Sequence, residues 1–577
     1  MPFSTFKGRT LHLLVALTKL AILIFAFGIT WYAGHRGIFL LDQSTIFDGG
    51  WRVLQGQAPY RDFYLVFGPL AFWLQALFFK LCGVTFTAMV VSAAVVNVVA
   101  TASVMRMGQL LSGGPTYPAL IGGLVTAIWF QPPYGTLSVE QVSFLFAVLA
   151  LQGLLEAGRL TAPSAKLCWF LSGCSVVLAC LSKQNAGAFF VPVCLGVIIV
   201  QSLESTKRTL ALLGLFIAGA LGVALAFLIW LRLFSDPAMF WRHAVAIAGE
   251  IGKERISGHI QALVENLFLC LITPRSAILP SMLAMFAGPV LLIVGVFNRR
   301  SASREISQLA LLGFLLAALP LYQNLFIAVT LNEPQNAEPF IGFILCLLIS
   351  AVLLLRKLSY SVSFRLKDAA LTVGLPSRKV VTILAAAAFL VMIGWVLGEG
   401  VNVARFRIVQ EFNYDTRFVS RLNVPGLERV YWGEPTQIPT RNGPVVIQEG
   451  DFEGLVRYLE SRPANFFVAG DATLLYGILH RESPQPLLYF QPGHSFTAED
   501  IPRLDQAILH ALQARNIRNV VREEFAFLGT EPAYAVFPHT WAWLNQEFRP
   551  ARQFGIFKVW ERKPGADDRT RDPSAGP

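Results

Sequence analysis

Charged side chains are scarce in this sequence. Asp, Glu, Lys and Arg together make up 14% of its 577 residues, whereas hydrophobic residues make up 54%. An ordinary soluble domain carries about 25% charged residues. Together with a mean hydropathy of +0.55, this shortage excludes a soluble globule and predicts a polytopic α-helical membrane protein.

Familiar catalytic motifs are also missing. The chain has no P-loop GxxxxGK[ST], no GxGxxG after a predicted strand, no HExxH and no GxSxG, so nucleotide-driven and zinc chemistry have no support. The seven cysteines all lie in apolar stretches, which argues against a disulfide framework and for packing over metal binding. The net charge of +11 comes mainly from basic loops beside apolar runs and does not indicate nucleic-acid binding.

Long apolar runs are plentiful. Since about 20 residues cross a hydrocarbon core of roughly 30 Å, the sequence predicts about eleven spans. They cover residues 11–33, 84–105, 117–133, 139–158, 166–182, 186–203, 209–231, 276–297, 306–330, 339–355 and 380–398. The first run lacks a small-residue cleavage site, so it is predicted to be a retained anchor.

The positions of Lys and Arg predict the orientation, because cytoplasmic loops are enriched in them. Lys7 and Arg9 place the N-terminus in the cytoplasm. The later basic loops face the same side only if the apolar stretch 64–82 does not cross. We therefore expect a transmembrane domain over residues 1–400. Its first outer loop, 34–83, is expected to contain a helix that lies in the outer interface or re-enters from it.

The composition becomes polar after the last run, and the predicted topology places residues 401–562 outside the cytoplasm. The segments DFEGLVRYLESR and IPRLDQAILHALQAR have the pattern of amphipathic helices. The segments GPVVIQE, NFFVAGD, NVVREE and FGIFKVWER read as short strands. Together they predict a small extracytoplasmic α/β domain, and the charged, Pro- and Gly-containing tail 563–577 is predicted to be disordered.

The polar side chains of the outer loops gather at one leaflet. They are Asp42, Asp48, Arg61 and Asp62 in the first outer loop, Glu140 in the second and Lys183 in the third. Transporters usually bury charges at mid-membrane and contain internal repeats. The one-sided distribution here favours chemistry at the membrane surface over alternating access.

The segment DQSTIFDGGWRVLQGQAPYRDF, followed by an apolar helix, resembles the first outer loop of the GT-C membrane glycosyltransferases. The branch it resembles contains the lipid A aminoarabinose transferases and the protein O-mannosyltransferases. That family places a catalytic acid just after the first span, which Asp42 matches, with Leu54 and Gly56 following. A second acid opens the fourth span, which Glu140 matches. The resemblance is carried mainly by residues 10–210.

The chain departs from the family pattern at three places. The family commonly has Asp-Glu where this chain has Asp42 and Gln43, Lys-Pro-Pro where it has FGPL, and His-Tyr where it has NEPQNAEPF. These departures affect the contacts to the donor phosphate. Arg61 and Lys183 are the expected substitutes, because an anionic headgroup needs cationic donors at this depth.

The resemblance implies an inverting glycosyltransferase at the outer leaflet of a bacterial inner membrane. It would move a hexosyl or pentosyl group from a polyprenyl-phosphate donor to a lipid, glycan or protein acceptor. Asp42 would be the general base, desolvated beside Phe47 and Trp51. Glu140 would orient the acceptor or hold a divalent cation, Mg²⁺ or Mn²⁺, and no other cofactor is indicated. The predicted substrate-binding set is Arg61, Asp62, Asp48, Trp51 and Lys183.

Each assignment has a structural alternative. Asp42 could cap a helix. Glu140 could be an acid at a helix N-terminus, where the helix dipole favours negative charge. Lys183 could reach the headgroups without touching substrate. Asp48 beside two glycines, and Asp62 beside Arg61, could form turns or local ion pairs. In GDATLLYGILHRESP, the residues Asp471, Tyr476 and Arg481 either bind the acceptor or form a turn and a helix.

Two other functions stay open from the sequence. A transporter or flippase of lipid-linked saccharides would also be polytopic and basic on its cytoplasmic side. A polysaccharide polymerase or ligase would centre on a large late outer loop, and the loop 235–275 is the candidate here.

Overall fold

The structure is a computed structural model of the chain. It describes residues 3–38, 40–113, 115–159, 162–202, 206–257, 278–298, 304–330, 338–358, 361–366, 369–374, 378–406, 418–433, 437–438, 443–446, 448–488, 490, 495–524 and 533–564. The chain divides into two compact units. The first consists of 1–33, 93–228 and 254–407, and the second of 34–92, 229–253 and 408–577.

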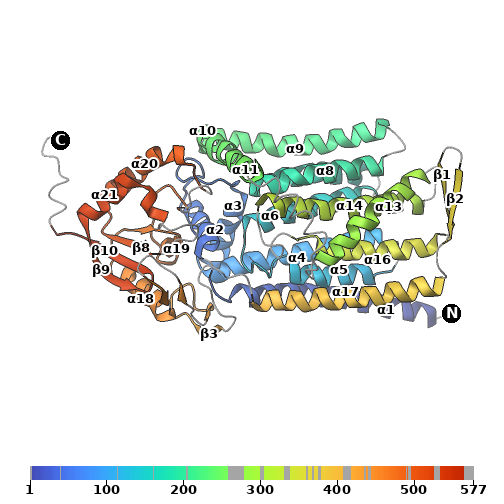
Figure 1. Cartoon of the computed structure of the whole chain (residues 1–577), viewed down its shortest axis with the longest axis horizontal. Helices are drawn as coiled ribbons and strands as arrows, with labels where there is room; N and C mark the ends of the chain where they lie inside the picture. Colours follow the sequence, from blue (N-terminus) through green and yellow to red (C-terminus); the bar gives the residue numbers. More distant parts are fainter. Residues whose placement is uncertain are drawn as a thin grey trace. The chain divides into compact units, whose positions relative to one another are not determined.

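The first unit is built from long helices that run side by side (Figure 1). They are α1 (Phe3–Gly34), α5 (Tyr117–Trp129), α6 (Val139–Ala157), α7 (Ala162–Ser182), α8 (Gln184–Gln201), α13 (Ile278–Phe297), α14 (Arg304–Thr330), α16 (Ile341–Lys357) and α17 (Arg378–Phe406), with most of α4 (Phe86–Leu111) and α9 (Thr206–Phe234). The antiparallel strands β1 (Ser361–Leu366) and β2 (Ala369–Gly374) precede α17.

Small residues let these helices approach closely. Helices α5 and α16 meet at Gly122 and Gly342. A Cβ atom on Gly122 would lie 2.9 Å from the Gly342 carbonyl oxygen, and one on Gly342 would lie 2.5 Å from the Gly122 carbonyl oxygen. Such contacts between small residues are typical of helix packing in membranes, where van der Waals contact rather than hydrophobic exclusion holds helices together.

The polytopic helical membrane architecture is confirmed. Among the described residues, eight helices are long and apolar enough to cross a membrane. They are Thr10–Gly34, Phe86–Leu111, Val139–Ala157, Pro163–Ser182, Gln184–Gln201, Thr209–Phe234, Leu279–Phe297 and Glu305–Ile327. The predicted runs 117–133, 339–355 and 380–398 coincide with α5, α16 and α17. The total of eleven spans stays a prediction.

The second unit begins with two helices, α2 (Leu40–Leu54) and α3 (Leu70–Cys82), which pack against each other. The 13 residues of α3 extend over roughly 20 Å, less than a hydrocarbon core of roughly 30 Å. Helix α5 has the same length, so the prediction that the stretch 64–82 does not cross stays a prediction. The short helix α10 (Pro237–Phe240), the π-helix η1 (Trp241–Ile247) and helix α11 (Ala248–Ser257) follow α9.

A four-stranded sheet forms the centre of the C-terminal part. Its order is β7-β8-β10-β9, in which β7 and β8 are parallel and the other pairs are antiparallel. The strands are β7 (Phe466–Ala469), β8 (Asn519–Glu523), β9 (Phe548–Phe554) and β10 (Phe557–Arg562), and short pairs are formed by β3 (Phe418–Arg421) with β4 (Tyr431–Gly433) and by β5 (Gln437–Ile438) with β6 (Val445–Val446). Gly555, at a φ of +54°, turns the chain between β9 and β10.

Helices cover both faces of this sheet. They are α18 (Glu449–Glu460), α19 (Leu474–Ile478), α20 (Ile501–Ala514) and α21 (Pro538–Glu547), with the 3₁₀ turns η3 (Ala498–Asp500) and η4 (Ala533–Val536). Because side chains alternate along a strand, Phe467 and Ala469 share one buried cluster with α20 and α21. Phe452 of α18 contacts Phe557 of β10, with ring centres 6.1 Å apart.

Most of the α/β elements predicted from the sequence are present. NFFVAGD contains β7, NVVREE contains β8 and FGIFKVWER contains β10, and the two amphipathic segments are α18 and α20. GPVVIQE was predicted to be a buried strand, but its strand β6 has only two residues and Val446 is exposed. Most of the tail predicted to be disordered, residues 565–577, lies outside the described residues.

Candidate active site

Helix α2 carries the predicted base and is held by close contacts on two sides. Asp42 lies in its first turn, and its side chain is exposed. Gly49 faces α3, where an added Cβ would lie 2.0 Å from the Phe72 ring. On another side Gly477 of α19 packs against Phe47, at 2.6 Å from the position of an added Cβ. The Asp-Gly-Gly sequence is therefore a packing surface within a helix and not a turn.

Asp48 and Arg52 form a buried ion pair one helical turn apart. Arg52 Nε lies 2.9 Å from Asp48 Oδ2, and the two side chains are 1% and 0% exposed. Burial raises the pKa of Asp48 to about 6, although the neighbouring Arg52 opposes this shift. This position favours a structural role for Asp48 over contact with substrate.

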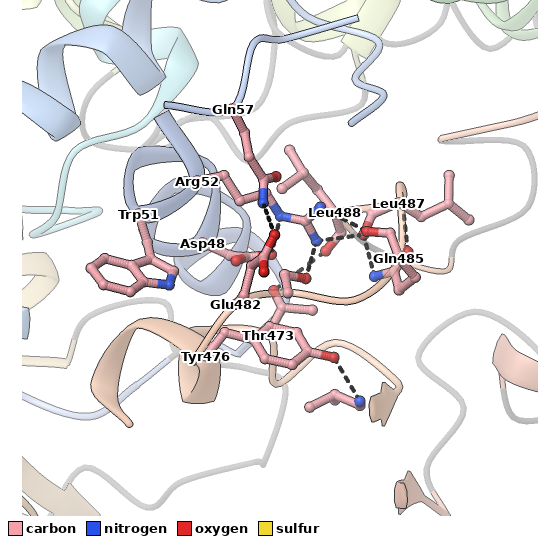
Figure 2. Close-up of polar contacts among 12 residues, drawn as sticks. Asp48, Trp51, Arg52, Gln57, Thr473, Tyr476, Glu482, Gln485, Leu487 and Leu488 are labelled. Carbon is pink, nitrogen blue, oxygen red and sulfur yellow. Dashed lines mark hydrogen bonds and ion pairs between the residues drawn. The ribbon is translucent and has the colours of Figure 1, made fainter. Parts of the chain in front are cut away.

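The other donors of Arg52 connect α2 to the segment 483–487. Figure 2 shows the guanidinium directed at this segment, where it donates to the Gln485 carbonyl at 2.7 Å and to the Leu487 carbonyl at 3.3 Å. It also donates to the Ser483 hydroxyl. The helix that carries Asp42 is thus fixed by residues more than 400 positions later in the chain.

Trp51 is part of the same contact. Its indole Nε1 donates to the Arg481 carbonyl at 2.8 Å, and its side chain is buried. We expected Trp51 and Phe47 to desolvate Asp42, and the structure corrects this. Asp42 is exposed, and Trp51 lies nine residues, or roughly 13 Å, further along the helix.

Arg61 and Asp62 follow α2 in a tight loop. Arg61 Nη2 lies 2.7 Å from Asp62 Oδ2, and the Ala58 amide donates to the same oxygen at 2.7 Å. Burial disfavours the charged carboxylate, but these donors outweigh it and lower the pKa of Asp62. Beside them Tyr60 adopts a φ of +68°, a strained conformation for a bulky residue. The Arg61 side chain is half exposed, so its cation remains accessible.

Glu140 and Lys183 are brought together in the first unit. Ser138 caps α6 by accepting the Gln141 amide at 3.3 Å, which places Glu140 in the first turn. Lys183, at the N-cap position of α8, forms an ion pair with Glu140. Lys183 Nζ also lies 5.5 Å from the centre of the Phe326 ring. The two residues were predicted separately, and their pairing was not anticipated.

The same unit holds a buried carboxyl group that the sequence reasoning did not select. Glu338, just before α16, is 2% exposed, and its Oε2 has no hydrogen-bond partner among the described residues. Burial raises the pKa of Glu338 to about 8. Its position in NEPQNAEPF, where the chain departs from the family pattern, was the available signal.

The residues considered in the C-terminal part turn out to be structural. Tyr476 is fully buried, and its hydroxyl accepts the Val468 amide at 2.7 Å (Figure 2). Asp471 is 5% exposed, beside Glu523, which accepts the Asp471 amide at 2.9 Å. Arg481 offers its carbonyl to Trp51. The alternative of a turn and a helix therefore describes this segment better than acceptor binding.

A divalent cation at Glu140 does not fit the observed contacts. Within the ranges that the structure describes, no group of three or more His, Cys, Asp or Glu side chains could hold a metal ion. The Glu140 carboxylate is instead neutralised by Lys183.

Comparisons with known proteins support the resemblance to the GT-C membrane glycosyltransferases. A family model described as dolichyl-phosphate-mannose-protein mannosyltransferase matches residues 67–230. No curated protein matches the chain in sequence. The resemblance drawn from the first outer loop is thereby confirmed.

Two crystal structures of ArnT share this fold. The crystal structure of ArnT from Cupriavidus metallidurans bound to undecaprenyl phosphate is 12% identical, with a TM-score of 0.50, covering 95% of this chain and 98% of that one. The apo form has the same identity and TM-score and covers 97% and 99%. The mycobacterial arabinofuranosyltransferase AftD, solved by cryo-EM, is 12% identical with a TM-score of 0.39, covering 96% of this chain and 40% of AftD.

Proposed function

We propose that this chain transfers a sugar from a polyprenyl-phosphate donor to an acceptor hydroxyl at the outer leaflet of a bacterial inner membrane. The observation that carries the proposal is an exposed acid, Asp42, in the first turn of α2, immediately after the first span of a GT-C fold. The ArnT crystal structure with undecaprenyl phosphate supports a lipid-linked donor.

The chemistry needs one base and a cation. Asp42 accepts the proton of the acceptor hydroxyl, and the oxygen attacks the anomeric carbon opposite the phosphate. The bond from that carbon to the phosphate oxygen breaks, and its electron pair leaves with the phosphate. The sugar is therefore transferred with inversion.

Arg61 and Lys183 are the proposed partners for the departing phosphate, because a cation stabilises the negative charge that develops there. Arg61 is half exposed in its pair with Asp62. Lys183 would exchange part of its contact with Glu140 for the phosphate, which would release the Glu140 carboxylate to orient the acceptor. In this scheme Asp62 holds Arg61 in place.

We also propose a membrane topology for the chain. The N-terminus of α1 would be cytoplasmic, and the unit with α2 and the four-stranded sheet would face the outside. This arrangement puts Asp42 on the side where the donor headgroup is exposed, while the donor's tail remains in lipid.

A transfer assay with radiolabelled polyprenyl-phosphate hexoses and pentoses tests the proposal. In membranes with matched expression, Asp42→Asn should lower transfer by at least about a hundredfold, since general-base catalysis contributes about 10² to 10⁴. Glu460→Gln, which alters an exposed acid at the end of α18, should be as active as wild type. Full activity of Asp42→Asn would show that another residue is the base. If the wild-type protein transferred no sugar from any donor, the transporter hypothesis would be favoured instead.

A further inference from the structure

A polar groove lies in the second unit, next to the loop that follows α2. Its volume is about 390 Å³, within the range of small-molecule sites, about 300 to 1,000 Å³. The loop after α2 contributes Gln57, Asp62 and Tyr64 to its lining, and the segment after α19 contributes Glu482. Arg515, at the end of α20, completes the charged lining.

The charged groups of this groove are arranged in a network. Arg515 Nη1 lies 2.7 Å from Glu482 Oε1 and donates to the Ser483 carbonyl at 3.1 Å. Gln57 Nε2 lies 3.5 Å from the same Glu482 oxygen. The Glu482 side chain is still 56% exposed, so its remaining acceptor capacity faces the solvent.

The balance of charge does not favour a strongly anionic ligand. Two carboxylates, Asp62 and Glu482, line the groove together with the guanidinium of Arg515, and Asp62 is also paired with Arg61. Each of these cations already has a carboxylate partner, and the carboxylates act as hydrogen-bond acceptors. A ligand that donates and accepts hydrogen bonds without net negative charge is favoured.

Part of the wall is small and apolar. Ala507 and Ala511, one turn apart on α20, leave an open strip between the polar groups, and Pro484 and Pro486 lie in the opposite segment. Tyr64 is held rigidly by stacking on His243, with ring centres 4.7 Å apart. Hydroxyl-bearing rings have the matching surface, with hydrogen-bonding edges and faces of C–H groups.

We propose that this groove binds a neutral saccharide portion of the acceptor. The inference rests on the proposed glycosyltransferase function and adds the acceptor class to it. Gln57 is three residues past the end of α2, and Arg52 fixes α2 to the segment 483–487 that lines the groove. A saccharide bound here is therefore held at a fixed position relative to the helix that carries Asp42.

Direct binding to the full-length protein in nanodiscs tests the groove. The probes are maltotriose, cellotriose and mannotriose, with trigalacturonate as an anionic comparison, followed by saturation-transfer-difference NMR. We expect at least one neutral trisaccharide to bind and trigalacturonate to bind more weakly. Absence of binding by every neutral probe, or tighter binding of trigalacturonate, overturns the proposal.

Groove-filling and matched variants locate the binding. Ala511→Phe fills the strip between the polar groups and should weaken trisaccharide binding by at least about tenfold. Gln513→Phe, which places the same ring on an exposed position of α20, should bind as wild type does. Glu482→Ala removes an exposed side chain and should weaken binding by about tenfold, since hydrogen bonds to charged groups are strong. Unchanged binding in Ala511→Phe and Glu482→Ala overturns the proposal.

A kinetic readout separates this proposal from the general function. In the transfer assay Ala511→Phe should raise the KM for the acceptor, whereas Gln513→Phe, which lies outside the groove lining, should keep the wild-type KM. If wild type transfers sugar and Ala511→Phe has the wild-type KM, the groove assignment fails while the function stands. If wild type binds the trisaccharide but transfers no sugar, the function fails while the groove assignment stands.

Discussion

Each of the two units contains an ion pair, and the pairs are built differently. Asp48 and Arg52 lie one turn apart on one helix, and their side chains are 0% and 1% exposed. Glu140 and Lys183 come from two different helices, and their side chains are 19% and 12% exposed. Arg52 directs its other donors at protein carbonyls. A fully enclosed pair supports the fold, while a pair that keeps access to solvent can exchange a partner for an anionic ligand.

Removing the enclosed cation gives the largest expected effect on stability. Arg52→Ala leaves Asp48 buried without its counter-ion and should lower the free energy of unfolding by about 3 to 5 kcal/mol. Thermal unfolding of the purified full chain, followed by tryptophan fluorescence, measures the loss. Arg457→Ala removes an exposed partner of Glu453 and should cost at most about 1 kcal/mol. Equal melting of the two variants would contradict a special role for the enclosed pair.

Substitutions in the Glu140–Lys183 pair should mainly affect sugar transfer rather than stability. Lys183→Met should lower sugar transfer by about a hundredfold, as expected when a donor to developing negative charge is removed. Its melting temperature should fall less than that of Arg52→Ala, because Glu140 retains access to water. Lys183→Arg keeps the charge and should recover part of the activity. Normal transfer by Lys183→Met would assign the pair to structure alone.

A smaller and pH-dependent effect is expected at Glu338, a buried carboxyl whose Oε2 has no partner among the described residues. Burial raises its pKa from 4.5 to about 8. Between these values the folded state binds more protons than the unfolded state, so this contribution to stability is complete below pH 4.5 and decreases as the pH rises to 8.

Glu338→Gln cannot ionise, so it should reduce the fall in melting temperature over this pH range. The comparison is made between wild type and variant at about pH 5 and about pH 8. Glu460→Gln, an exposed acid, serves as the control and should follow the wild-type slope. Identical slopes in all three proteins would show that Glu338 is solvated in the folded state.

The sequence predicted the helical membrane class and most of the C-terminal α/β elements because their patterns are local. Short apolar runs identified β7 and β8, and the 3.6-residue period identified α18 and α20. For Asp48 it left a turn, a local ion pair and substrate contact open, and the structure has the ion pair, with Arg52. Two successive glycines suggested a turn, but α3 packs so closely that only glycine fits at Gly49, and the helix continues through both.

The candidate site was predicted only in part, for a different reason. Asp42, Arg61 and Glu140 could be selected from their positions at span ends, but contacts between distant segments leave no local pattern. The pairing of Glu140 with Lys183 spans 43 residues. Glu338 was overlooked because the departure of NEPQNAEPF from the family pattern does not by itself indicate that the tertiary structure buries this carboxyl.

The bonds from Arg52 to the segment 483–487 also constrain the order of biosynthesis. The two ends of the Arg52–Gln485 hydrogen bond are 433 residues apart, which a ribosome covers in roughly 20 to 90 s at about 5 to 20 residues per second. During that interval α2 is without these partners. Chains interrupted before residue 483 cannot complete these bonds, so the helix carrying Asp42 acquires its final support only near the end of translation.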